Sequence, residues 1–135
     1  MAKRWEERIS DLRNAVSRLD EAIRDNKKYE IESLKDAVIQ RFEFTLELSW
    51  KAIKTYLNSE GVLEATTPKQ TIREAFSKGI IENADIWIDM LNDRNLTSYT
   101  YNQEISNKIY ENIVKIYIEE IKKIYELLDK MEVEE

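Results

Sequence analysis

The chain has 135 residues, a formal net charge of −6 and 42% hydrophobic residues, which suits one domain with a buried core. Two Gly and one Pro are too few for the turns of a sheet protein or a glycine-rich phosphate loop. Because His and Cys are absent, histidine-based catalysis, thiolate catalysis and metal sites built from these side chains are excluded. The composition therefore favours a protein of long helices.

The first 60 residues predict two long helices. Apolar residues recur at alternating spacings of four and three over residues 5–23, which predicts an amphipathic helix that breaks at residues 25–28. A second apolar stripe over residues 31–57 predicts a longer helix. We expect this second helix to end before Gly61, with Gly61 in the left-handed conformation that follows many helices.

A short third helix is predicted after this pair. Thr67 is expected to cap it, Pro68 to occupy its first position and Gln70 to complete a capping box. Phe76 is expected to face inward together with its apolar neighbours on the same helix, and Gly79 to end the helix.

The second half of the chain predicts one more short helix and one long one. The short helix spans residues 83–93, and residues 94–101 follow without a helical stripe. A capping box from Thr100 to Gln103 is expected to open the last helix, which runs to about residue 131. Besides its main apolar stripe this helix carries a second one, composed of Tyr110, Val114, Ile118 and Tyr125.

Three long helices and two short ones predict an all-α fold, an up-and-down antiparallel helical bundle. Residues 1–131 are expected to form this single domain, and residues 132–135 a frayed acidic tail. The second stripe predicts an apolar surface beyond one core, and therefore a homodimer. No apolar run approaches the roughly 18 residues of a membrane span, and no signal peptide is evident, so we expect a cytoplasmic protein.

The segment 94–101 concentrates polar and aromatic side chains between two predicted helices. Arg94 offers a fork of donors for a phosphate, and a helix start nearby favours anions. Tyr99 and Tyr101 can stack on a base or bind a phosphate oxygen. The alternative is that Arg94 caps the preceding helix while the tyrosines close one end of the bundle. In the first interpretation, the further phosphate-binding residues are Asn95, Ser98 and Thr100.

Metal and cofactor chemistry finds little support in the sequence. Glu43 and Glu47 lie one helical turn apart, but no matching acidic pair occurs elsewhere, so we expect no metal site and no cofactor.

The same segment resembles the signature of the HEPN superfamily, in which Arg, four residues, His, any residue and Tyr follow one another. Here Arg94 and Tyr101 match, while Tyr99 stands where the signature has His. The chain also resembles the HepT-like branch, the nucleotidyltransferase substrate-binding proteins, over about residues 5–130. The stretches that carry this second resemblance are residues 41–45, 47–51, 67–68, 73–76, 79–81, 87, 90–91, 94–95, 97–98 and 100–102.

This resemblance implies a dimeric all-α bundle paired with a separately encoded minimal nucleotidyltransferase. In this family the helical subunit is interpreted either as the substrate-binding half of the transferase or as a metal-independent RNase toxin. The transferase neutralises the toxin, in some members by transferring AMP to the tyrosine of the signature. Carried over by position, Arg94 takes the role of the signature arginine and Tyr101 that of the AMP acceptor.

Tyr99 makes RNase activity doubtful. RNA cleavage without a metal requires a group that exchanges protons near neutral pH, whereas the pKa of a tyrosine is near 10. Arg94, Tyr99 and Tyr101 nevertheless remain the candidate catalytic residues. Three hypotheses follow: a binding and regulatory toxin-side subunit of the transferase, an active RNase toxin with Tyr99 in place of His, and a purely structural helical interaction protein. The first is favoured; the sequence leaves open the substrate, the RNA target and whether Tyr101 is modified.

Overall fold

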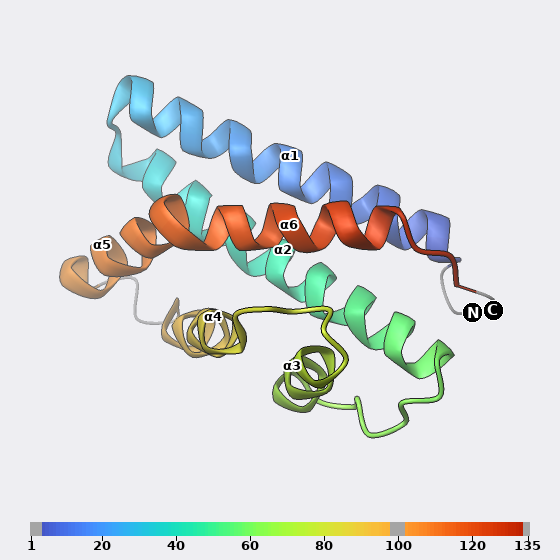
Figure 1. Cartoon of the computed structure of the whole chain (residues 1–135). Coiled ribbons are helices and arrows are strands. Elements are labelled where there is room, and N and C mark those ends of the chain that lie inside the picture. The colour runs from blue at the N-terminus through green and yellow to red at the C-terminus, as the bar shows by residue number, and fades with distance from the viewer. Residues whose placement is uncertain (1–3, 98–101, 134–135) are drawn as a thin grey trace.

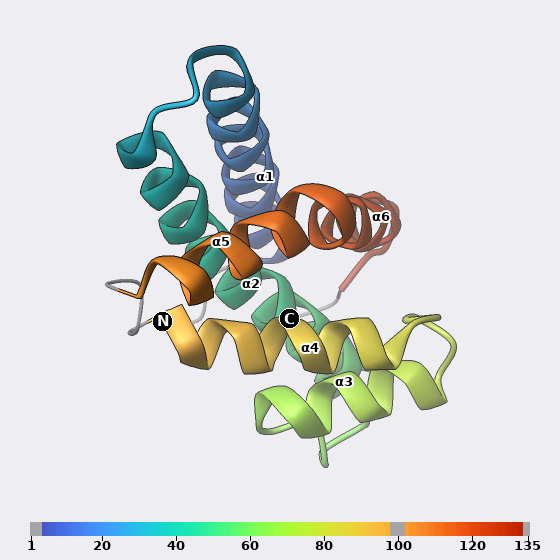
Figure 2. The ribbon, with the colours of Figure 1, turned by 90° about the vertical axis from the view of Figure 1, so that its left-hand side faces the viewer.

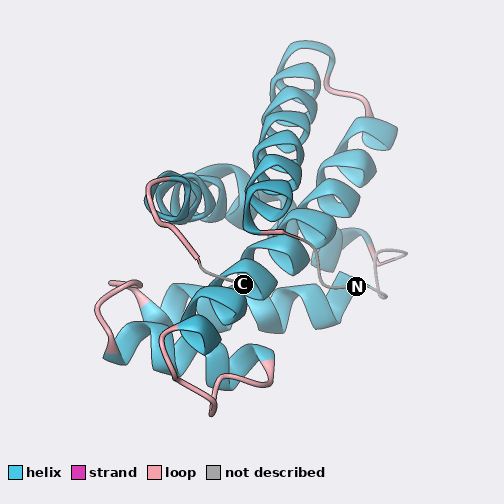
Figure 3. Ribbon diagram, turned by 90° about the vertical axis from the view of Figure 1, so that its right-hand side faces the viewer, coloured by secondary structure: helices cyan, strands magenta, loops and turns pink. Residues whose placement is uncertain are grey.

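A computed structural model describes residues 4–97 and 102–133, and within these ranges every regular element is a helix (Figure 3). The first four helices are α1 Trp5–Tyr29, α2 Glu32–Ser59, α3 Pro68–Ser77 and α4 Ala84–Leu96. The last long helix consists of α5 Gln103–Asn112, the π-helical turn η2 Ile113–Tyr117 and α6 Ile118–Asp129. The prediction of three long and two short helices in an all-α fold is therefore confirmed.

The long helices pack side by side, and the short ones lie across them. In Figure 1, α1 runs antiparallel to both α2 and α6, and α3 and α4 are seen almost end-on below α2. Figure 2 shows α4 along its length between α3 and α5. This arrangement brings the end of α4 close to α2 on one side and to the last helix on the other.

A continuous apolar core joins all these helices. Phe42 of α2 and Tyr117 of η2 stack within this core, with ring centroids 5.5 Å apart. The largest fully buried side chains of the described residues are Trp87, Phe42, Leu12, Leu19, Ile39, Leu46, Ile53, Leu57, Ile72, Met90, Ile109 and Ile113. Nearly all of them lie on the predicted stripes, so the periodicity of apolar residues accounts for the bundle.

The end of α1 differs from the prediction. The helix continues through the predicted break at residues 25–28 to Tyr29, and Glu30 adopts the left-handed conformation with φ 52°. Asn26 lies on the buried side and donates from Nδ2 to the hydroxyl of Tyr110 at 2.6 Å. Asn26 thus continues the buried side of α1 by one turn beyond its last buried apolar residue. Because Asn26 is polar, the spacing of apolar residues could not predict this turn.

The predicted ends of α2 and α3 are largely confirmed. Gly61 and Gly79 have φ values of 88° and 78°, and the hydroxyl of Thr67 accepts from the amide of Gln70 at 3.3 Å. The capping box is incomplete, however, because the hydroxyl of Thr66 donates to the side chain of Gln70. The expectation for Phe76 is wrong: this side chain is 52% exposed.

The second stripe of the last helix is not a free surface. Tyr110 and Ile118 are buried within the bundle, while Val114 and Tyr125 are half-buried against its core. This stripe therefore provides no argument for a dimer. The described residues do expose other large apolar side chains, which are Tyr29, Ile31, Phe44, Leu63, Phe76, Leu96, Ile116 and Leu127.

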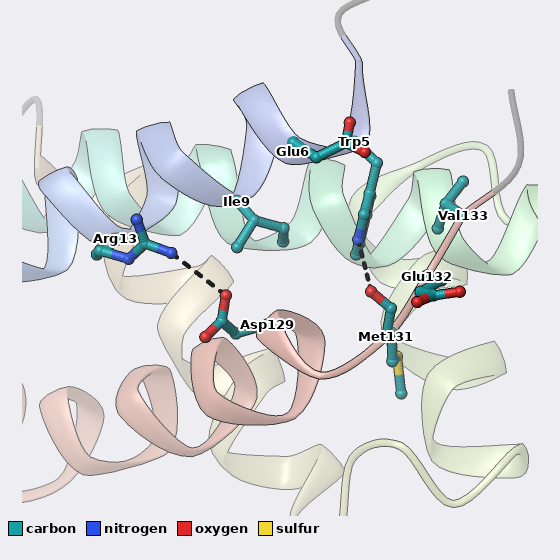
Figure 4. A pocket seen from close by; sticks show the side chains of 8 residues that line it. All are labelled: Trp5, Glu6, Ile9, Arg13, Asp129, Met131, Glu132 and Val133. Carbon is teal, nitrogen blue, oxygen red and sulfur yellow. Dashed lines mark hydrogen bonds and ion pairs between the residues drawn. The ribbon is translucent and has the colours of Figure 1, made fainter.

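A pocket of about 430 Å³ lies between the first turns of α1 and the end of the last helix (Figure 4). The indole of Trp5 donates to the carbonyl of Met131 at 2.9 Å. Arg13 lies 3.3 Å from the carboxylate of Asp129 and donates to the hydroxyl of Tyr125 at 2.7 Å. These contacts tie the start of α1 to the end of the last helix.

Candidate functional site

Arg94 and Asn95 belong to a helix rather than to a loop. The structure extends α4 to Leu96, three residues beyond the predicted end, and Thr97 follows as its C-cap. The hydroxyl of Thr97 donates to the carbonyl of Arg94 at 2.7 Å and so satisfies a terminal group of the helix. Since Leu96 is 41% exposed, this last turn has no apolar stripe that could have predicted it.

Four of the predicted site residues lie outside the described part of the chain. These are Ser98, Thr100 and the two tyrosines of the signature, Tyr99 and Tyr101. The predicted capping box from Thr100 to Gln103 is wrong as the start of the last helix. α5 begins at Gln103, and the side chain of Asn102 caps it by accepting from the amides of Glu104 and Ile105 at 3.0 and 3.2 Å.

The guanidinium of Arg94 pairs with Glu47 of α2. Arg94 Nη2 lies 3.4 Å from Glu47 Oε2, and the same oxygen accepts from the indole of Trp50 at 3.2 Å. Lys51 contacts the other oxygen of Glu47 at 3.2 Å. Both oxygens of Glu47 therefore face cations or donors.

These contacts stabilise the ionised form of Glu47. Partial burial acts against the charge, but the hydrogen bonds from Trp50 and Lys51 and the charges of Lys51 and Arg94 outweigh it. As a result the pKa of Glu47 lies below its usual range. Glu47 is therefore negatively charged at neutral pH and holds Arg94 through their ion pair.

Arg94 and Asn95 line a pocket of about 290 Å³, which we call the Arg94 pocket. Its walls come from α2, the start of α3 and the last turns of α4, and its lining residues are Glu47, Trp50, Thr67, Pro68, Lys69, Leu91, Arg94 and Asn95. The volume is near the lower limit of about 300 Å³ for small-ligand pockets.

The contacts of Arg94 do not use all of its donors. Within the described residues, the buried Nε of Arg94 has no hydrogen-bond partner. Lys69 is exposed and provides a second cation in the lining of the pocket. With Arg94 and Lys69 against the single carboxylate of Glu47, the lining has a net positive charge, although the whole chain carries −6. The pocket can therefore bind an anion of moderate size.

The described residues offer no group of three or more His, Cys, Asp or Glu that could hold a metal ion. The pair Glu43 and Glu47 is accordingly not joined by further acidic ligands, and both oxygens of Glu47 face Arg94, Trp50 or Lys51. Glu47 is better described as a partner of Arg94 than as a ligand.

Two residues of this region, Lys69 and Asp93, do not stand out as site residues in the sequence. Lys69 belongs to the predicted start of α3, and nothing in the sequence indicates that α3 begins beside Arg94. Asp93 is the last residue of a predicted helix, yet its carboxylate accepts from Asn112 and from Tyr117, at 3.0 and 2.6 Å. Its position next to Arg94 in sequence is the single available signal.

The chain belongs to the family described as "Nucleotidyltransferase substrate binding protein like", whose model matches residues 7–130. A Haemophilus influenzae protein described as "Probable ribonuclease HepT" is 36% identical over 85 residues. That match spans 60% of this chain and 58% of the relative. The family assignment implied by the signature and its surrounding stretches is confirmed.

Solved structures share this fold. A Haemophilus influenzae protein, described as having the fold of a substrate binding domain of a nucleotidyltransferase, superposes with a TM-score of 0.82 at 27% identity. The superposition covers 90% of this chain and 99% of that protein. A Thermus thermophilus protein gives a TM-score of 0.77 at 31% identity, over 88% of this chain and 99% of its own. Among the described residues, no helix is both long and apolar enough to cross a membrane.

Proposed function

We propose that this chain is the substrate-binding and regulatory, toxin-side subunit of a two-component system whose other component is a separately encoded minimal nucleotidyltransferase. The observation that carries the proposal is the Arg94 pocket, where Arg94 and Lys69 provide two cations in a chain of net charge −6. The family supports the pairing, since its members are described by their relation to a nucleotidyltransferase.

The ligand of this site is a nucleotide or RNA phosphate. Arg94 donates to phosphate oxygens through the groups that Glu47 leaves open, and Lys69 adds a point charge. Asn95 lies in the same pocket, and Ser98 and Thr100 follow in sequence as further donors. Tyr101 is the AMP acceptor, and no cofactor of its own is needed because the transferase provides the metal. We propose a cytoplasmic location for this system, since nucleotides and RNA are available there.

Titration of the whole chain with AMP tests the site. We expect the Arg94→Ala variant to bind AMP about 10- to 100-fold more weakly, as expected for the loss of hydrogen bonds to a charged group. Arg73→Ala is the matched control, because Arg73 is an exposed arginine on α3 that does not line the pocket. Equal affinity of wild type and Arg94→Ala would exclude the site.

RNA cleavage is the second candidate function, because a relative is described as a probable ribonuclease. In this chain Tyr99 replaces the histidine of the signature, and a phenol is a poor base at neutral pH. We therefore expect weak cleavage by the purified chain and stronger cleavage by Tyr99→His. Strong cleavage by wild type that disappears in Tyr99→Phe would favour the RNase over the regulatory subunit.

We also propose a two-fold homodimer, which the family resemblance implies. Exposed apolar side chains support it, above all Phe44 at 61% exposure on α2. Light scattering at micromolar concentration should give twice the mass of one 16.1 kDa chain. A particle of a single chain's mass would contradict the dimer.

A further inference from the structure

The last long helix contains a π-helical turn, η2, next to the end of α4. The amide of Ile118 donates to the carbonyl of Ile113, five residues back, as in a π-helix. Such turns occur often at functional sites. In a regular α-helix, residues five apart differ in direction by about 140°, so Asn112 and Tyr117 would point to different sides. The π-turn brings these two side chains to the same side.

Asn112 and Tyr117 both donate to one oxygen of Asp93, and we call these three residues the Asp93 clamp. Asn112 Nδ2 lies 3.0 Å and the hydroxyl of Tyr117 lies 2.6 Å from Asp93 Oδ2. Burial, and then the hydrogen bond and charge of Asp93, raise the pKa of Tyr117, so the phenol stays neutral and keeps its proton for this contact.

The clamp acts on the residue directly before Arg94. The last two turns of α4 are thereby held from two sides: Asp93 is bound by the last long helix, and Arg94 by Glu47 of α2. In sequence, the clamp brackets the Arg94–Tyr101 segment, because Asp93 precedes it and Asn112 follows it.

We propose that the Asp93 clamp positions Arg94 for anion binding in the Arg94 pocket, with Asp93 as a positioning residue that does not itself touch the ligand. The role in ligand binding rests on the proposed function, whereas the fixing of the end of α4 does not. If the clamp served stability alone, its loss would lower the free energy of unfolding and leave the affinity for AMP unchanged.

Two substitutions at Asp93 separate these roles in the full chain. Asp93→Ala removes the acceptor, and we expect it to weaken AMP binding on the order of tenfold. Asp93→Asn should restore binding close to that of wild type, because an amide oxygen accepts from Tyr117 and the amide nitrogen can face the oxygen of Asn112. Asp36→Ala, which removes an exposed carboxylate from α2, should bind as wild type does.

Hydrogen exchange provides a readout that does not depend on the ligand. In Asp93→Ala, the amides of residues 91–96 should exchange faster than in wild type. The amides of α1 should still exchange only through global unfolding of the chain, as in wild type. If Asp93→Ala does not fold, Tyr117→Phe removes a single hydroxyl of the clamp and is measured in the same two ways.

The outcomes distinguish the two proposals. If AMP binding does not depend on Arg94, the proposed function fails, and the exchange of residues 91–96 still decides whether the clamp fixes α4. If AMP binding depends on Arg94 but a folded clamp variant binds AMP as wild type does, the positioning role of the clamp is overturned, whatever the exchange of residues 91–96 shows.

Discussion

The three long helices and the end of α4 are held in place by different forces. Along α1, α2 and α6 the packing is mainly apolar, and side chains such as Leu12, Leu46 and Ile121 are fully buried. At the end of α4 the contacts are polar: Asp93 binds Asn112 and Tyr117, and Arg94 binds Glu47. Apolar burial adds stability without fixing directions, whereas hydrogen bonds fix the positions of particular atoms.

The apolar core and the polar contacts of α4 therefore contribute differently to the protein: the core provides stability, and the polar contacts orient side chains. The apolar core contributes most of the free energy of unfolding, since burying a large apolar side chain is worth about 1.5–3 kcal/mol. Half-exposed ion pairs such as Arg94 with Glu47 contribute at most about 1 kcal/mol. Such a pair is better suited to orient a guanidinium than to stabilise the bundle.

Adjacent residues of α2 offer the sharpest contrast. Leu46 is fully buried, and we expect Leu46→Ala to lower the free energy of unfolding by about 2–5 kcal/mol. Glu47→Gln should cost less than about 1 kcal/mol, because its partner Arg94 is 39% exposed. Urea unfolding of both variants measures the two values. Similar losses at the two positions would break the distinction between the core and the Arg94 pocket.

A smaller effect is expected from Tyr117→Phe. Tyr117 keeps its stacking on Phe42 as a phenylalanine, but Asp93 loses its shorter hydrogen bond, which should cost about 1–3 kcal/mol. Denaturant unfolding of this variant beside Tyr125→Phe, whose hydroxyl contacts Arg13 at an exposed position, tests the claim. A loss no larger than that of Tyr125→Phe would mean that the Asp93 contact adds nothing beyond a surface hydrogen bond.

The smallest effect concerns pH. Because contacts in the folded state lower the pKa of Glu47, its contribution to stability is fully present above about pH 4.5 and is lost as pH falls through the lower folded-state value. Glu47→Gln should therefore lose less stability than wild type when the pH is lowered from 6 to about 3. The urea unfolding midpoints of wild type and Glu47→Gln at the two pH values test this expectation. Equal losses of stability in the two proteins would show that the fold does not favour the ionised form of Glu47.

The same division explains which parts of the structure could be predicted from sequence. The stripes of α1, α2 and the last helix repeat locally, so the number of helices and most of the core followed from spacing. The extension of α1 to Tyr29 depends on a hydrogen bond between Asn26 and Tyr110, 84 residues apart in sequence. Spacing within one helix contains no information about such a contact.

The candidate site was predictable only in part. Arg94 and Asn95 stood out because polar residues gather after residue 93, the predicted end of that helix, and they do line a pocket. Lys69 and Glu47 join Arg94 only through the packing of α2, α3 and α4. The Asp93 clamp depends on a π-turn, which leaves no mark in the apolar pattern because Ile113 and Tyr117 are buried as predicted.

Mass mapping tests whether this chain is, as we propose, the partner and acceptor of a nucleotidyltransferase. The full chain is incubated with its nucleotidyltransferase, ATP and magnesium, and the peptides are then examined for added nucleotide. We expect AMP on Tyr101, with Tyr99 as the competing acceptor, and a lower yield in Arg94→Ala. If the transferase modifies another substrate but leaves both tyrosines unlabelled, the acceptor role is contradicted.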